Sequence, residues 1–115
     1  MSRDTRPVSW VKAARRDFEA FPERARIHIL RALTIAAAGR KADIAKPMKG
    51  LGSGVFEIAL AARGDAYRVV YALLIDEAIW VVHAFMKKSK SGIGTPRAEI
   101  DLIRHRLKRL QEVLR

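Results

Sequence analysis

A chain of 115 residues and 12.9 kDa has the size of one compact domain, and with 50% hydrophobic and 30% charged residues it can bury a core. The absence of cysteine excludes a disulfide framework, a thiolate zinc site and a cysteine nucleophile. The mean hydropathy is −0.07, and every apolar run is shorter than the roughly 18 residues of a membrane span, which predicts no transmembrane helix. The polar N-terminus shows no signal-peptide pattern, so we expect a cytoplasmic protein.

The charge is strongly positive, with 23 Lys and Arg against 12 Asp and Glu, a net +11. It is spread along the chain: residues 1–50 hold twelve basic and five acidic residues, and residues 51–115 hold eleven and seven. A folded positive surface favours a polyanionic partner, either nucleic acid or an acidic protein. The alternative is that these groups serve only solubility.

The first third of the chain predicts a strand followed by two helices. Residues 7–11 are strand-forming, and Pro7 fits only an edge or first position. From Lys12 to Ala38, apolar residues recur at helical spacing, interrupted by Pro22. We therefore expect one helix to about Ala20 and a second from about Pro22 to Ala38.

The middle of the chain predicts a loop and then an antiparallel meander. Residues 40–54 contain Pro47 and three glycines and read as a loop. Three strands follow, over residues 56–61, 66–75 and 79–86, with turns at residues 63–65 and 76–77. The third strand is apolar on both faces, so we expect it to be central and covered by helices.

The last helix is predicted to start with Thr95 as N-cap and Pro96 in the first position, and to end near Val113. Its apolar stripe is Ile103, Leu107, Leu110 and Leu114, with Arg104, Arg106, Lys108 and Arg109 expected outside. The prediction is thus an α+β single domain over residues 1–115, with element order β-α-α-β-β-β-α.

Residue types that usually carry metal or nucleotide chemistry are placed without the required spacing. His28 and His105 fall at exposed helical positions, and no histidine pair suits a metal, so we expect neither metal nor cofactor. His83 is predicted to share a strand face with Ile79, Val81 and Phe85, where a buried, hydrogen-bonded role is favoured over a catalytic one. The glycine run at residues 50–54 precedes a strand, unlike a P-loop, which favours a turn over a phosphate cradle that uses Lys49.

Basic side chains gather around the predicted meander and form the main candidate site. Arg68 lies on an otherwise apolar strand face and therefore needs an anion, either a phosphate or Glu57 on the neighbouring strand. We expect the group to share one concave surface, with Tyr67, Tyr71 or Phe85 available for base stacking. The basic members are Lys49, Arg63, Arg68, Lys87 and Lys88.

Four segments follow one another at a characteristic spacing: Lys49-x-Leu51-x-x-Gly54-Val55-Phe56-Glu57, Tyr67-Arg68-Val69-Val70-Tyr71, Val82-His83-Ala84-Phe85-Met86-Lys87-Lys88-Ser89 and Thr95-Pro96-x-x-Glu99-Ile100. In this order they resemble the RelE/ParE toxin superfamily, and in particular its HigB-like, phage-derived branch. The resemblance covers about residues 8–114. It implies a RelE-like fold and a type II toxin held inactive by a co-encoded antitoxin, in this branch usually a helix-turn-helix protein.

RelE-like and HigB-like members cleave mRNA in the ribosomal A site, so the resemblance implies a metal-independent endoribonuclease. It places Arg68 on the scissile phosphate and assigns charge stabilisation or leaving-group protonation to Lys87 or Lys88, with Lys88 the preferred lysine. RNA contacts would come from Lys49, Arg63, Lys90, Tyr67 and Phe85. No tyrosine follows Tyr71, unlike many ribosome-dependent relatives, which leaves His83 as the candidate titrating ring for catalysis in the C-terminal part of the chain.

Two other functions stay open. ParE-like members of the superfamily inhibit DNA gyrase on the same fold, so fold alone does not choose between the targets. The chain could also be a degenerate toxin that binds RNA or a partner without cleaving.

Overall fold

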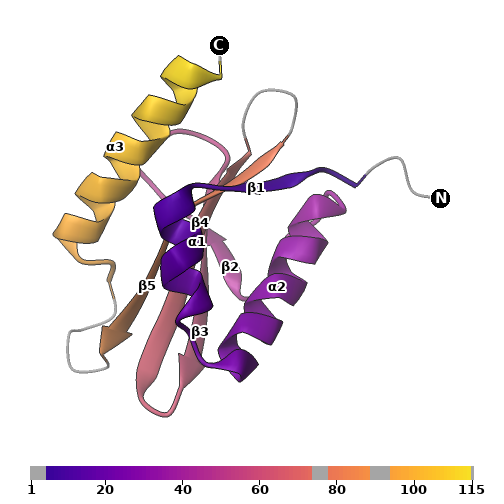
Figure 1. Cartoon of the computed structure of the whole chain (residues 1–115), viewed down its shortest axis with the longest axis vertical. Helices are drawn as coiled ribbons and strands as arrows, with labels where there is room; N and C mark the ends of the chain where they lie inside the picture. The colour runs from indigo at the N-terminus through magenta and orange to yellow at the C-terminus, as the bar shows by residue number, and fades with distance from the viewer. Residues whose placement is uncertain (1–4, 74–77, 89–93, 115) are drawn as a thin grey trace.

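The computed structural model describes residues 5–73, 78–88 and 94–114, which form a five-stranded sheet and three helices (Figure 1). The elements are β1 (Val8–Trp10), α1 (Lys12–Glu19), α2 (Glu23–Ala37), β2 (Ala45–Pro47), β3 (Val55–Ala62), β4 (Asp65–Leu73), β5 (Ile79–Lys88) and α3 (Arg97–Val113). The strand order is β1-β5-β4-β3-β2. Strands β2 to β5 pair antiparallel, and β1 pairs parallel with β5. The α+β class and the antiparallel meander are therefore confirmed.

The expectation that the third meander strand is central is wrong: β4 is the middle strand, and among the described strands β5 has a neighbour on its other side only at Ile79–Val81, where it pairs with β1. Strand β5 is apolar on both faces because helices cover both of them.

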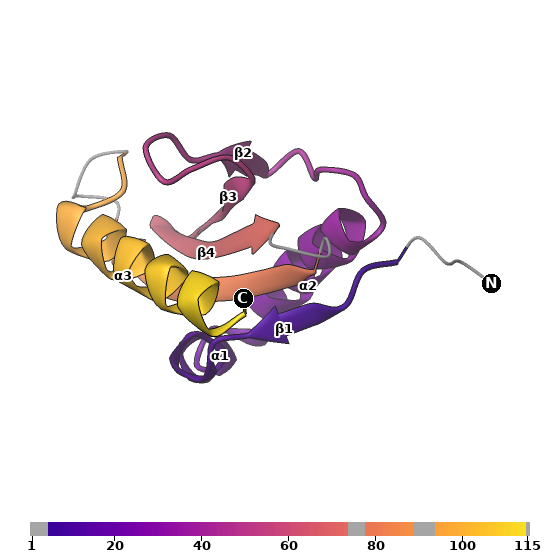
Figure 2. The same cartoon turned by 90° about the horizontal axis from the view of Figure 1, so that it is seen from above.

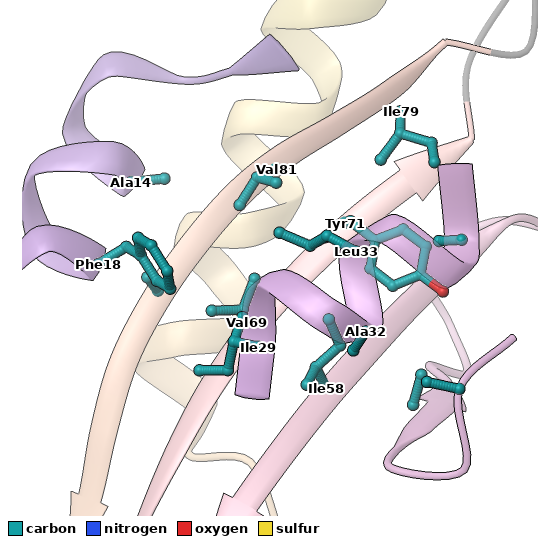
Figure 3. Packing of buried hydrophobic residues seen from close by; sticks show 14 of the residues in the cluster. Ala14, Phe18, Ile29, Ala32, Leu33, Ile58, Val69, Tyr71, Ile79 and Val81 are labelled. Atoms are coloured by element: carbon teal, nitrogen blue, oxygen red, sulfur yellow. The ribbon is translucent and has the colours of Figure 1, made fainter. Parts of the chain in front are cut away.

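Helices cover both faces of the sheet, with α3 on one side and α2 on the other (Figure 2). The larger core lies under α1 and α2, where Phe18, Ile29 and Leu33 meet Val69 and Tyr71 of β4 (Figure 3). The helical spacing of the apolar residues in α1 and α2 produces this packing, because it places one stripe of each helix against the sheet. The smaller core lies under α3.

Two predicted boundaries are wrong. Residues 40–54 contain the short strand β2, which pairs with Phe56–Ile58 of β3. A three-residue edge strand with one buried position, Ala45, shows no alternation that a sequence could reveal. Helix α3 begins at Arg97 with Pro96 as N-cap, and Thr95 makes no capping hydrogen bond. The predicted turn at residues 76–77 lies outside the described residues.

A bulge in β5 changes which side chains share a face. Val70 pairs with His83 but Tyr71 pairs with Val81, so Val82 is an extra residue on β5. Ile79 and Val81 consequently face α1 and α2. The prediction that His83 shares their face is wrong: His83 lies on the α3 face together with Phe85, the cross-strand partner of Arg68.

The β3–β4 turn has the backbone of a tight hairpin. Ala62 pairs with Asp65, and between them Arg63 and Gly64 have φ values of 53° and 84°. Positive φ at both central residues matches the twist of the flanking strands. Among the described helices, none has the length and apolarity that crossing a bilayer requires.

Candidate functional site

The centre of the α3 face of the sheet holds an ion pair rather than a free cation. Arg68 on β4 donates from Nη1 to Glu57 Oε1 on β3 at 3.1 Å and to Thr95 Oγ1 at 3.3 Å. Thr95 donates in turn to Glu57 Oε2 at 2.9 Å. The side chains of Arg68 and Glu57 are only 12% and 14% exposed, so the anion that Arg68 needs is present in the fold.

Lys87 lies beside this group and is also buried, with 4% exposure. Its Nζ donates to the carbonyl of Gly94, just before α3. Burial lowers the pKa of Lys87 below its usual value of 10.5, and the charge of Arg68 lowers the pKa further, while Glu57 opposes both. Lys87 is thus a lysine whose environment eases proton release.

Further along β5, His83 is 3% exposed and both ring nitrogens have partners from α3. Nε2 is 2.5 Å from Glu99 Oε1, and Nδ1 is 3.0 Å from Arg106 Nη1, which also donates to the carbonyl of Val82 at 2.9 Å. An arginine has no acceptor, so Nδ1 must accept and Nε2 must carry the proton that it donates to Glu99. This geometry fits the buried, hydrogen-bonded interpretation of His83.

The structure divides the predicted basic surface between two faces. Arg68, Phe85 and Lys87 lie on the α3 face, as the register shows. Lys88 follows Lys87 and points to the opposite face, where its exposed amine is 3.9 Å from Asp65. The expectation of one surface was wrong because neighbouring residues of a strand alternate between faces.

Tyr67 and Tyr71 also lie on the face of α1 and α2. The ring of Tyr67 is 5.0 Å from that of Phe21 in an edge-to-face contact. Tyr71 is 2% exposed and stacks on Phe56 at 5.3 Å, and burial raises the pKa of its hydroxyl. Tyr71 is therefore part of the core and has no surface for a base.

The remaining predicted basic residues are peripheral. Arg63 is exposed at the hairpin tip and, with Tyr67, Arg24 and His28, lines a hollow of about 540 Å³. Lys49 is exposed in the loop before β3, and Lys90 lies outside the described residues. In that loop, Gly54 has φ +81°, and a Cβ there would lie 3.3 Å from the carbonyl oxygen of Leu73, which explains this glycine by close approach to β4.

Sequence reasoning missed the parts that α3 contributes to this face. Arg106 was predicted to be exposed and is instead partly buried against His83. Thr95 was predicted only as a helix cap, although it contacts Glu57 of β3, and the contact of Glu99 with His83 of β5 was not predicted. A signal was present: Glu99 and Arg106 lie seven residues apart on the same helical stripe as Ile103 and Leu110. Among the described residues, no group of three or more His, Asp and Glu side chains could hold a metal.

Comparison with known proteins gives a family and a fold. The family described as "Phage derived protein Gp49-like (DUF891)" matches residues 16–108. Among curated proteins, none matches this sequence significantly. The structure resembles a mutant of the E. coli toxin RelE in the free state, with TM-score 0.62, 13% identity and coverage of 91% of this chain and 97% of that one.

Two further structures share the architecture. The isolated E. coli RelE toxin gives a TM-score of 0.57 at 14% identity, covering 87% of this chain and 97% of RelE. A chain of the toxin–antitoxin complex RelBE2 from Mycobacterium tuberculosis gives 0.51 at 19% identity, covering 76% and 97%. At these identities the likeness shows a RelE-like fold.

Proposed function

The chain belongs to the Gp49-like family of phage-derived proteins, and from that premise we propose that it is the toxin of a type II toxin–antitoxin system. Its activity in this proposal is metal-independent cleavage of mRNA on the ribosome. The RelE-like fold and the net charge of +11 support this reading. A cognate antitoxin, in the HigB-like reading a helix-turn-helix protein, would hold it inactive in the cytoplasm.

The observation that carries the proposal is the adjacency of two buried cations, Arg68 and Lys87, on one face of the sheet. Burial and the charge of Arg68 both lower the pKa of Lys87. A phosphodiester between them would meet a planar guanidinium suited to its oxygens and an ammonium that gives up its proton more readily than an ordinary lysine does.

RNA cleavage without a metal needs four things from a protein: alignment of the 2′-hydroxyl with the phosphate, removal of its proton, stabilisation of the added negative charge, and protonation of the leaving 5′-oxygen. Arg68 would hold the phosphate and stabilise its charge. As the bond from the 2′-oxygen to phosphorus forms and the bond to the 5′-oxygen breaks, the proton of the 2′-hydroxyl would pass to solvent water, and Lys87 would give its proton to the leaving 5′-oxygen. Lys87 replaces Lys88 in this role, because Lys88 is exposed on the opposite face. Gly94 accepts a hydrogen bond from Lys87, and Glu57 and Thr95 accept from Arg68, so RNA must compete with these three partners.

The test is to map new RNA 5′ ends across the transcriptome shortly after induction in a bacterial host. Wild type should give cuts within translated frames, and Arg68→Gln and Lys87→Met should abolish them. Lys88→Met distinguishes the two lysines, and Arg104→Gln, an exposed arginine of α3, is the matched charge control; both should cut normally. Growth arrest without new ends would overturn the proposal.

Because Arg68→Gln leaves Glu57 without its partner, loss of cleavage could reflect misfolding. The double variant Glu57→Gln/Arg68→Gln removes both charges and keeps both side chains close to their original size. If the double variant folds and fails to cut, the guanidinium is needed for RNA and not only for the ion pair. A double variant that cuts like wild type would assign Arg68 a structural role alone.

Gyrase inhibition is the second candidate function, and the outer surface of α2 favours it. Ile27 and Leu30 are each 45% exposed and, with Arg31, Thr34 and Ile35, line a shallow hollow of about 480 Å³. Exposed apolar side chains at helical spacing suit contact with a protein partner. If growth arrest persists in the Arg68 and Lys87 variants and is lost in Leu30→Glu, gyrase becomes the leading target.

A further inference from the structure

A hollow of about 600 Å³ opens beside the exposed edge of β5. Strand β1 pairs with β5 only at Ile79–Val81, and beyond that point no described strand covers this edge. The volume lies in the range of small-molecule sites, and the lining is mainly apolar with a few polar groups, as such sites are built. The lining residues on which the argument rests are Phe21, Tyr67, His83, Phe85 and Glu99.

Two carboxylates, Asp17 and Glu99, line this hollow, and Glu99 is held in a fixed orientation. Glu99 accepts from His83 Nε2 at 2.5 Å, and His83 is fixed by Arg106 at 3.0 Å. The glutamate side chain is still 31% exposed, whereas that of His83 is 4% exposed. A carboxylate has about four lone-pair sites, so Glu99 can accept further hydrogen bonds from a ligand while it keeps His83.

The wall next to Glu99 is aromatic. Phe85 is 8% exposed, and one face of its ring stacks on the His83 ring at 5.1 Å with 23° between their planes. The Phe85 ring presents a small apolar surface to the hollow, which a base can contact while its Watson–Crick edge is read by hydrogen bonds, as in the recognition of single-stranded RNA. A carboxylate offers only acceptors, and guanine is the RNA base that presents two adjacent donors on that edge, N1–H and the 2-amino group.

The hollow also adjoins the two buried cations. Phe85 is the cross-strand partner of Arg68, and Lys87 lies two residues further along β5, roughly 7 Å away. A nucleotide whose phosphate meets Arg68 and Lys87 can therefore place its base at Phe85. The negative charge of Glu99 attracts the N–H donors of a base and repels a phosphate. The base, and not the phosphate, should therefore enter the hollow.

We propose that this hollow is a guanine-selective base pocket, in which Glu99 accepts from N1–H and the 2-amino group and Phe85 forms an apolar wall that the base contacts. His83 and Arg106 are positioning residues behind Glu99. The inference rests on the proposed RNA-cleaving function and names the base that this site selects.

The test is an NMR titration of the purified protein with 5′-GMP, 5′-IMP, 5′-AMP and 5′-CMP. GMP and IMP differ by the 2-amino group alone, so we expect IMP to bind about five- to tenfold more weakly, with shifts centred on Phe85 and Glu99. In the Glu99→Gln variant, the ratio of the affinity for GMP to the affinity for IMP should fall to near one. The matched control Asp101→Asn, an exposed carboxylate on the same helix, should keep the ratio.

Phe85→Leu provides a second variant, because it keeps an apolar side chain and changes the shape of this wall of the hollow. It should weaken all four nucleotides while retaining the GMP-to-IMP ratio. The proposal is overturned if GMP and IMP bind wild type equally, if the shifts lie elsewhere, or if a folded Glu99→Gln protein keeps the preference.

The maps of RNA 5′ ends distinguish this proposal from the function on which it rests. Cuts that favour guanine in wild type and lose that preference in Glu99→Gln support both. If the base preference of the cuts is the same in Glu99→Gln as in wild type, the pocket is overturned and the proposed nuclease function stands. GMP selectivity without any cuts would overturn the nuclease and leave the pocket.

Discussion

The two faces of the sheet are built from the same strands but differ in chemistry. The face under α1 and α2 is an apolar core, in which Ile29, Ile58 and Val69 are fully buried. The face under α3 has a smaller apolar cluster around Ile103, and beside it the buried or partly buried Glu57, Arg68, His83 and Lys87. Helices α1 and α2 therefore stabilise the fold, while α3 also supplies polar partners to a candidate site.

The difference shows how a small basic protein can bury charge. Each buried charge on the α3 face has a hydrogen-bond partner contributed by another element: Glu57 from β3, Thr95 and Gly94 before α3, and Glu99 and Arg106 within α3. Such groups contribute little net stability, because desolvation offsets most of the attraction. The gathering of these buried charged side chains on one face of the sheet therefore fits a role in binding better than a role in folding.

The largest expected effect is on the apolar face. Ile29→Ala should lower the free energy of unfolding by about 2–5 kcal/mol, because it removes a fully buried side chain and leaves a cavity. Urea denaturation measures the change. Ile27→Ala on the same helix, where the side chain is 45% exposed, should stay within about 0.5 kcal/mol of wild type. Equal losses for the two variants would contradict the assignment of this face as the main core.

A smaller loss is expected when α3 is separated from the polar face. Arg106→Met should cost about 1–3 kcal/mol, since His83 Nδ1 and the Val82 carbonyl lose a donor inside the protein. Lys108→Met, exposed on the same helix, is the control and should change little. A ¹⁵N spectrum of the wild-type imidazole should show protonated Nε2 and unprotonated Nδ1; the reverse tautomer would refute the described network.

Lys87 should make the stability of the polar face depend on pH. Its pKa is lowered by folding, so the unfolded state binds more protons between the folded pKa and 10.5. The free energy of unfolding of wild type should therefore rise relative to that of Lys87→Met as the pH increases towards 10.5. Urea denaturation at several pH values measures this difference, with Lys88→Met as the baseline for loss of one charge. A difference that stays constant with pH would rule out the expected shift.

The smallest effect is expected outside both faces. Arg15 and Glu19 form an exposed pair on α1 at 3.2 Å, with side chains 65% and 57% exposed. Glu19→Gln should cost only about 0.3–0.5 kcal/mol, and less at high salt. Thermal unfolding at two salt concentrations checks this. A cost comparable to that of Arg106→Met would mean that surface charge matters to this fold as much as buried polar contacts do.

Periodicity predicted most of the fold because it reports local geometry. The helices on either side of Pro22 and the alternation in β3 and β4 follow from side chains repeating at the period of one element, whereas β5 was predicted from an apolar run without alternation. The sequence did not predict β2, because three residues are too few to show a repeating pattern. Its strand conformation comes from pairing with β3. The start of α3 was misplaced because Thr95 hydrogen-bonds to the sheet instead of the helix.

The candidate site was predicted in its residue types and not in its arrangement. The sequence by itself determined that Arg68 needs an anion and that a basic run leaves β5, because charge and burial follow from residue type. Only the tertiary structure decided that Glu57 and Thr95 contact Arg68, that the bulge at Val82 turns His83 towards α3, and that Lys87 and Lys88 lie on opposite faces. These outcomes depend on register and on a helix distant in sequence, which no local pattern encodes.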